Sequence, residues 1–139
     1  MNTIDVSRPV PQPNEVTRPF WDAAASHRLV HPRCRSCGRT FFPPHLCCPH
    51  CRASDWAWEE GAGRGTVHSA TVVHRAPQPG FAPPYVIAVV DLDEGHDLMT
   101  NVVGVDPHAV RIGQRVRVTW LEVGEHVLPV FEPDEEADA

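Results

Sequence analysis

The hydrophobic and polar positions of this 139-residue chain indicate a short helix followed by a series of strands. Thr17-Arg18-Pro19 has the composition of a helix start, with Thr17 as the N-cap and proline in the first turn. We expect the helix to run to about Leu29. Phe20 and Trp21 lie on neighbouring faces of this helix, where they either cover the protein's own core or dock onto another molecule.

From Gly65 onward the pattern is typical of strands. The expected strands are residues 65–75, 85–92, 96–103, 115–123 and 127–131. A helical turn that begins at Asp106-Pro107 separates the third strand from the fourth. In the fourth strand, Val116, Val118 and Trp120 share the face expected to point inward, and Pro129 marks the last strand as an edge. Five strands with a helical turn in this place predict an OB-fold barrel.

Composition adds boundaries to this mainly β architecture. We expect a flexible arm over residues 1–16, a helix and cysteine-bearing region over 17–60, a barrel over 61–133 and a disordered acidic tail over 134–139. The formal net charge is −6, and five acidic residues lie in the last eight positions. The remainder is therefore close to neutral, which does not favour binding to nucleic acid phosphates.

Cysteine spacing gives the clearest chemical signal. Cys34-x-x-Cys37 and Cys48-x-x-Cys51 are two knuckles separated by ten residues. Zinc prefers four such ligands in a tetrahedron, and a shell closed by four cysteines makes the metal structural rather than catalytic. Cys47 does not fit the spacing and is spare. Iron in place of zinc, or disulfides in a secreted protein, would be the alternatives.

Other features narrow the function. The N-terminus lacks the basic start and the apolar stretch that a signal peptide has. The longest apolar run is far shorter than a membrane helix. We therefore expect a cytoplasmic protein with reduced thiols. The chain contains no lysine, so it cannot itself supply a Schiff base or a phosphate-loop lysine. Scattered pairs such as His68 and Asp91 have no spacing that demands catalysis.

The cysteine region is basic. No acidic residue occurs between Asp22 and Asp55. The same interval holds five arginines: Arg28, Arg33, Arg35, Arg39 and Arg52. They either offset the charge of a zinc–thiolate cluster, bind the phosphates of a coenzyme or bind nucleic acid. The barrel strands offer few exposed aromatic residues for base stacking, so the sequence makes a single-stranded nucleic-acid-binding protein the alternative rather than the preferred interpretation.

A proline-rich loop, Pro77–Pro84, joins the first two expected strands and carries Phe81. In an OB-fold this loop flanks the usual binding face. Proline stiffens the loop, so an aromatic side chain on it suits contact with a ligand or a partner. The loop folded back on its own barrel is the other possibility.

The motifs together resemble a known family. In chain order they are Pro19-Phe20-Trp21, Cys34-x-x-Cys37-Gly38, Phe42-Pro43-Pro44, Cys48-Pro49-x-Cys51, Gly65-x-Val67, Pro79-Gly80-Phe81-x-Pro83-Pro84-Tyr85 and Gly113-x-x-Val116. Over about residues 17–133 the chain resembles the zinc-ribbon OB-fold proteins, formerly a domain of unknown function. The resemblance implies an N-terminal helix, a rubredoxin-like zinc ribbon with one zinc ion, and an OB-fold barrel.

Members of this family resemble non-catalytic partners of thiolase-fold enzymes, which include thiolases, acyltransferases and the retro-aldolases of steroid side-chain breakdown. Some are fused to, or work with, hot-dog-fold enoyl-CoA hydratases, which here would be a separate polypeptide. The resemblance implies that such proteins bind acyl-CoA or bridge enzyme subunits. It makes the knuckle cysteines the zinc ligands. It also implies contacts to acyl-CoA or the partner at Phe20, Trp21, Arg35, Arg39, Phe81, Pro83, Pro84 and Tyr85.

Overall fold

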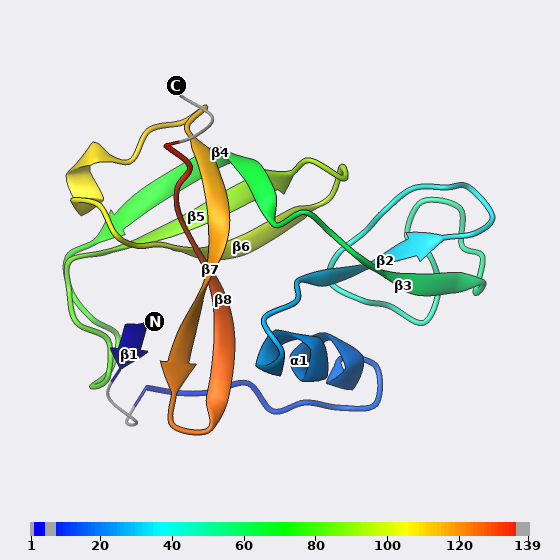
Figure 1. Ribbon diagram of the computed structural model, residues 1–139, viewed down its shortest axis with the longest axis horizontal. Coiled ribbons are helices and arrows are strands. Elements are labelled where there is room, and N and C mark those ends of the chain that lie inside the picture. The colour runs from blue at the N-terminus through cyan, green and yellow to red at the C-terminus, as the bar shows by residue number, and fades with distance from the viewer. Residues whose placement is uncertain (1, 5–7, 136–139) are drawn as a thin grey trace.

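The structure is a computed structural model that describes residues 2–4 and 8–135, and it consists of a helix, a two-stranded hairpin with long loops, and a barrel (Figure 1). The elements in chain order are β1 (Asn2–Ile4), α1 (Arg18–Ala25), β2 (Val30–Cys34), β3 (Trp56–Glu60), β4 (Arg64–Val73), β5 (Tyr85–Leu92), β6 (Asp97–Val102), the 3-10 turn η1 (Pro107–Ala109), β7 (Arg115–Val123) and β8 (His126–Pro133).

The barrel consists of β4 to β8. The strand order is β1-β7-β4-β5-β6-β8, and a further pairing of β7 with β8 closes the sheet. With η1 between β6 and β7, this is the five-stranded OB-fold arrangement that the pattern predicted. β1 adds a parallel strand beside β7, in a segment that the sequence led us to expect as an arm.

The expected strands match the observed ones closely. β5 and β7 have the predicted bounds, and Asp106 caps η1 by accepting a hydrogen bond from the His108 N–H at 2.9 Å. A register shift between Val67 and Ser69 bends β4, which is a common device for curving a strand around a barrel. β2 and β3, which form the separate hairpin, were not predicted.

The helix is shorter than expected. It ends at Ala25, with Ser26 as its C-cap, because the next residue, His27, adopts a left-handed backbone conformation with φ 58°. This releases Leu29 to pack into the core. The predicted cap at Thr17 is correct in position only. Its side chain does not cap the helix and instead accepts a hydrogen bond from the N–H of Asn14.

β7 and β8 form a hairpin that buries opposite faces at its two ends. At the start of β7, Val116 belongs to the main core, whereas Leu121 and Val123 at its end lie in a second cluster with residues of β8. Val10 and Trp21 cover that second cluster. The inward face therefore changes along β7, and the prediction that Trp120 is core is only partly right: it is half-buried and stacks on His27 at 5.4 Å.

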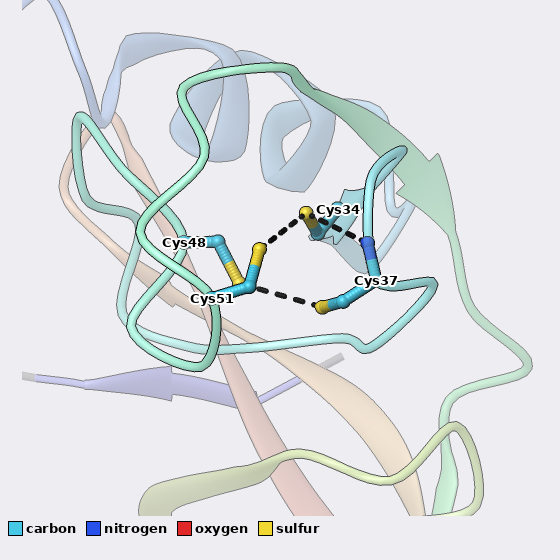
Figure 2. A group of neighbouring side chains, drawn as sticks. All are labelled: Cys34, Cys37, Cys48 and Cys51. Carbon is cyan, nitrogen blue, oxygen red and sulfur yellow. Dashed lines mark hydrogen bonds between the residues drawn. The ribbon is translucent and has the colours of Figure 1, made fainter.

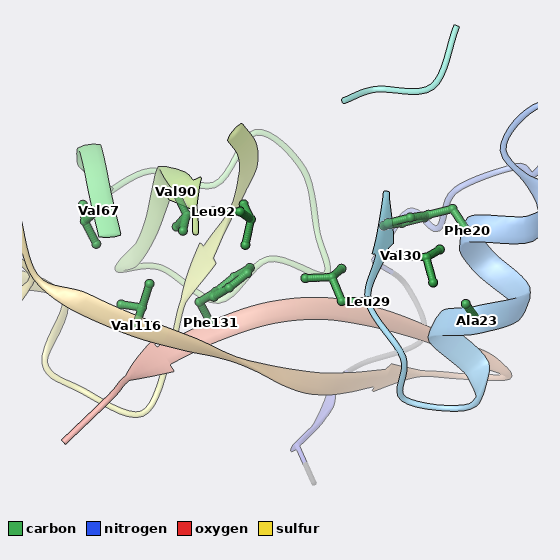
Figure 3. Close-up of a cluster of buried hydrophobic side chains, with 9 residues drawn as sticks. All are labelled: Phe20, Ala23, Leu29, Val30, Val67, Val90, Leu92, Val116 and Phe131. Atoms are coloured by element: carbon green, nitrogen blue, oxygen red, sulfur yellow. The ribbon is translucent and has the colours of Figure 1, made fainter. Parts of the chain in front are cut away.

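One apolar core connects the barrel with the helix and β2 (Figure 3). Its buried members are Phe20, Ala23, Leu29, Val30, Val67, Val90, Leu92, Val116 and Phe131. Leu29 lies between the barrel side chains and those of α1 in this cluster. The hairpin that carries the cysteines is thereby joined to the barrel by shared side-chain packing rather than by a linker alone.

The C-terminal segment differs from the expected tail at Asp134. This residue is fully buried, its carboxylate accepts a hydrogen bond from Arg64 at 2.7 Å, and its N–H donates to the Arg115 carbonyl. The rest of the expected tail, beyond residue 135, lies outside the described residues. Within the described residues, no helix has the length and apolar character that crossing a membrane requires.

Candidate metal centre and apolar groove

The four knuckle cysteines come from the two loops that β2 and β3 hold together. Cys34 is the last residue of β2, and the second knuckle precedes β3. Each knuckle is closed by the same turn: the Gly38 N–H donates to the Cys34 carbonyl, and the Arg52 N–H donates to the Cys48 carbonyl. Both closing residues have positive φ, 78° and 68°, so the two loops repeat one geometry.

The four sulfurs converge on one point (Figure 2). All lie within 4.8 Å of one another, with Sγ–Sγ distances of 3.5 Å between Cys34 and Cys51 and 3.8 Å between Cys37 and Cys48. Tetrahedral zinc with Zn–S bonds of about 2.3 Å requires S–S separations of roughly 3.8 Å. The cysteines are free thiols, so the arrangement fits a metal and is too open for a disulfide.

The titration of the thiols also suits a metal. The N–H of Cys37 donates to the Cys34 sulfur, which lowers the pKa of Cys34 to about 7. The N–H of Ala53 acts on Cys51 in the same sense, but the neighbouring sulfurs outweigh it and raise the pKa of Cys51 to about 11. Crowding by the neighbouring sulfurs therefore keeps the Cys51 thiol protonated, and binding of a cation would release that proton.

The surroundings of the cluster distinguish its cysteines from the fifth. Cys34 and Cys48 are buried and pack with Phe41 and Trp56. Cys47 is exposed and is not part of the cluster. The spare role predicted for Cys47 is consistent with this placement.

Three of the five arginines in the basic region are paired with acids of or near β3. Arg28 lies 3.5 Å from Glu60, Arg33 2.8 Å from Glu59, and Arg35 2.9 Å from Asp55. Arg39 and Arg52 are exposed and form no ion pair with a described residue. The free positive charge of the ribbon is smaller than the sequence count implied, which further weakens the nucleic-acid interpretation.

An apolar groove of about 400 Å³ lies where the N-terminal segment, α1, the first ribbon loop and the barrel meet. Its lining residues are Arg8, Pro11, Thr17, Phe20, Trp21, Phe42, Pro43, Pro44, Leu98, Met99, Thr100, Asn101, Leu128, Pro129 and Val130. Phe20 contacts Phe42 at a ring separation of 5.0 Å and Trp21 at 4.9 Å, so the helix aromatics both complete the core and form a wall of the groove.

The proline-rich loop reaches the same region through Arg8. The Arg8 guanidinium lies 5.0 Å above the Phe81 ring, which stacks on Tyr85 at 5.7 Å. Arg8 also donates to the Asn101 side chain at 3.0 Å, and partial burial lowers its pKa. Of the residues predicted for acyl-CoA or partner contacts, Phe20 and Trp21 line the groove, and the others do not: Arg35, Arg39, Phe81, Pro83, Pro84 and Tyr85. Phe81 lies beside the groove only in that it contacts the lining residue Arg8.

Several groove residues had no assigned role in the sequence. Phe42 and the two prolines after it belong to the motifs of the resemblance, which was the available signal for them. No signal in the sequence marked Arg8 or Met99, because an arginine in a proline-rich segment and a methionine in a strand are both common in proteins without a binding role.

Comparison with known proteins agrees with this geometry. Residues 21–57 match the family model for the rubredoxin-like zinc ribbon domain of ChsH2, and residues 58–121 match the model for its C-terminal OB-fold domain. The chain is a zinc-ribbon OB-fold protein, and zinc is its metal cofactor. It belongs to the ChsH2 family, whose relatives include proteins described as DUF35 domain-containing scaffold proteins.

Individual relatives show how far the similarity extends. A probable enoyl-CoA hydratase alpha subunit of Thermomonospora curvata is 46% identical over 91% of this chain, which spans 40% of that relative. A DUF35 domain-containing scaffold protein of Methanothermobacter thermautotrophicus is 32% identical over 80% of this chain and 85% of its own length. A chain of the solved Ltp2-ChsH2(DUF35) aldolase is 45% identical, with a TM-score of 0.82 over 89% of this chain and 98% of that one.

Proposed function

We propose that this chain is a non-catalytic accessory subunit of an acyl-CoA-processing complex, in which it bridges a thiolase-fold enzyme and its acyl-CoA. The partner would be a thiolase, an acyltransferase or an aldolase, and a hot-dog-fold hydratase would be a further partner. One observation carries the proposal: the 45% identity of this protein to a chain of the Ltp2-ChsH2(DUF35) aldolase. The match covers 98% of that chain, and the name of the aldolase gives two components.

The polar groups of the chain support a role without chemistry of its own. His68 and Asp91 lie 2.9 Å apart, but both side chains are more than half exposed, and neither lines the groove. His31 and Glu59 are also paired, but His31 is buried within β2 against the His96 ring. A nucleophile or base needs a neighbour and a cavity for substrate, and neither pair has both.

The zinc ribbon supplies rigidity in this proposal. We assign the zinc to Cys34, Cys37, Cys48 and Cys51, whose closed shell leaves no position for substrate. The residues assigned to acyl-CoA or partner contacts are Phe20, Trp21, Arg35, Arg39, Phe81, Pro83, Pro84 and Tyr85. The groove supports Phe20 and Trp21, which line it, and Phe81 contacts the lining residue Arg8. The exposed Arg39 suits a coenzyme phosphate better than Arg35, which already pairs with Asp55. The proposal places the complex in the cytoplasm, where thiols stay reduced.

Purification of the tagged chain from its native cell tests the proposal. We expect a thiolase-fold polypeptide at about one copy per chain, identified by mass spectrometry, and absent from a mock purification with the tag alone. Recovery of the chain by itself would contradict the partnership. Turnover of acyl-CoA by the pure chain would contradict the non-catalytic role.

A further inference from the structure

The barrel has a gap between β6 and β8. These two strands pair in parallel at a single position, Val102 with Phe131, and the Val103 N–H donates to the Phe131 carbonyl at 2.8 Å. Away from that point, β6 remains paired with β5 and β8 with β7. The edges of β6 and β8 that face each other therefore separate, and residues of both strands line the groove between them.

The main-chain groups of β6 alternate between the two sides of the strand. The Leu92 N–H donates to the His96 carbonyl, and Val103 donates to β8. In an antiparallel ladder this alternation directs even-numbered residues of β6 toward β5 and odd-numbered residues toward the gap. The N–H and C=O groups of Met99 and the N–H of Asn101 consequently point into the gap, where no strand of the described chain pairs with them, whereas the Asn101 carbonyl faces Phe131 of β8 at the single bridge.

The opposite edge does not supply the missing partners. Pro129 of β8 has no N–H, and its carbonyl accepts from the Thr100 hydroxyl at 3.2 Å. The proline explains why β8 leaves β6 here, because a residue without a donor is tolerated at a strand edge. The open edge is thus a feature of β6, with apolar walls on either side.

The side chains around this edge define what it would accept. Met99 is 71% exposed, which is unusual for a large apolar side chain that lines a groove. Among the described residues that line the groove, Arg8 carries the only formal charge. An open strand edge, an apolar floor and one cation together match an extended peptide with apolar side chains and a carboxylate.

We infer that the edge of β6 at Met99 and Asn101 is the docking site for an extended segment of the partner enzyme, which adds to β6 as a strand. This inference rests on the proposed function and names the surface through which it operates. The segment's main chain pairs with the N–H and C=O of Met99 and with the N–H of Asn101, its apolar side chains cover Met99 and Trp21, and an acidic residue reaches Arg8.

Matched charge substitutions test the site. Met99→Glu places a carboxylate at the edge, whereas Ile112→Glu does the same at an equally exposed apolar residue, 74% accessible, that does not line the groove. We expect Met99→Glu to weaken binding of the co-purified thiolase-fold enzyme by about tenfold or more, and Ile112→Glu to leave it within about twofold. Calorimetric titration of the folded variants measures both.

Hydrogen exchange of the wild-type chain gives a second readout that needs no variant. On binding the enzyme, the segment 97–103 should gain protection at the two amides of Met99 and Asn101, while the loop 106–113 stays unchanged. Wild-type affinity in Met99→Glu, or unchanged exchange over 97–103 in the complex, would overturn the docking site alone.

Other occupants of the groove give different results. A Met99-dependent dimer of the pure chain would assign the edge to a second copy, and loss of acyl-CoA binding in Met99→Glu with intact enzyme affinity would assign it to the acyl chain. Either outcome overturns the inference. Failure of the wild-type chain to bind any thiolase-fold enzyme would remove the proposed function and this site together.

Discussion

At the scale of single residues, the metal cluster separates four cysteines from a fifth. Cys51 lies in the cluster and Cys47 does not. We expect Cys51→Ser to lose most of the zinc and to be largely insoluble, because structural zinc contributes on the order of 10 kcal/mol to the folding of such modules. Cys47→Ser should retain about one zinc per chain and normal solubility. Elemental analysis of both variants, expressed side by side, measures the difference.

A second variant, in the other knuckle, tests whether the loss of zinc in Cys51→Ser reflects the metal site rather than a local change at position 51. Cys34→Ser removes a sulfur from the other knuckle and should behave like Cys51→Ser, since the closed shell needs all four sulfurs. Equal zinc in all three serine variants would show that the metal is held elsewhere.

The sequence could reveal the cysteines but not every residue that matters. Spacing within each knuckle is local, so the four sulfurs were readable without a fold. The roles of Arg8 and Asp134 depend on partners 93 and 70 residues away, Asn101 and Arg64. Such pairings exist only after the chain has folded. Nothing in the local pattern distinguished Arg8 from the rest of the expected N-terminal arm, or Asp134 from the rest of the expected acidic tail.

At the scale of elements, the turn between β5 and β6 holds the ribbon against the barrel. The Thr40 hydroxyl donates to the Glu94 carbonyl at 2.9 Å, and the Ala62 N–H donates to the Glu94 carboxylate at 3.0 Å. Beside these bonds the buried rings of His31 and His96 lie 4.4 Å apart. This junction is therefore both polar and closed to most solvent.

The junction should be sensitive to acid. Burial, together with the nearby His31, lowers the pKa of His96 to about 4, although Glu94 acts in the opposite direction. The unfolded chain then binds more protons than the folded chain as pH falls from about 6.5 to 4. Stability should be full above about pH 6.5 and should decrease by roughly 2 kcal/mol across that range, after allowance for partial solvent screening.

Denaturant unfolding at several pH values checks this dependence. His96→Phe keeps an aromatic ring beside Phe42 and removes the titration, so its free energy of unfolding should decrease less between pH 6.5 and 4 than that of the wild type. An identical slope in both proteins would show that His96 does not control the acid response.

Element prediction succeeded where apolar positions alternate or run together, and failed where they do neither. The alternating residues of β7 and the continuous apolar sequence of β5 mark their strands by pattern alone. β2 reads Val-His-Pro-Arg-Cys, with a proline and two basic residues inside the strand. It is a strand because β3 pairs with it and the metal loops hold the pair together, which a local pattern does not record.

At the scale of the whole molecule, ribbon and barrel share one core. Leu29 and Val30, which lead into and begin β2, belong to the same buried cluster as Val90 and Phe131 of the barrel (Figure 3). Shared packing of this kind couples the stabilities of the two parts, because neither can lose its contacts without exposing the other's apolar surface. A platform for another enzyme needs such coupling, since a mobile ribbon would add an entropic cost to docking.

This coupling predicts one unfolding transition. The zinc-loaded chain should show a single calorimetric peak, because the shared core makes ribbon and barrel unfold together. Leu29→Ala should lower the stability of that one transition by about 2–5 kcal/mol, through loss of packing on both sides of the junction. Leu46→Ala is the matched control, because Leu46 is 77% exposed and should have little effect. Two separate peaks, with only one of them shifted in Leu29→Ala, would mean that ribbon and barrel fold independently.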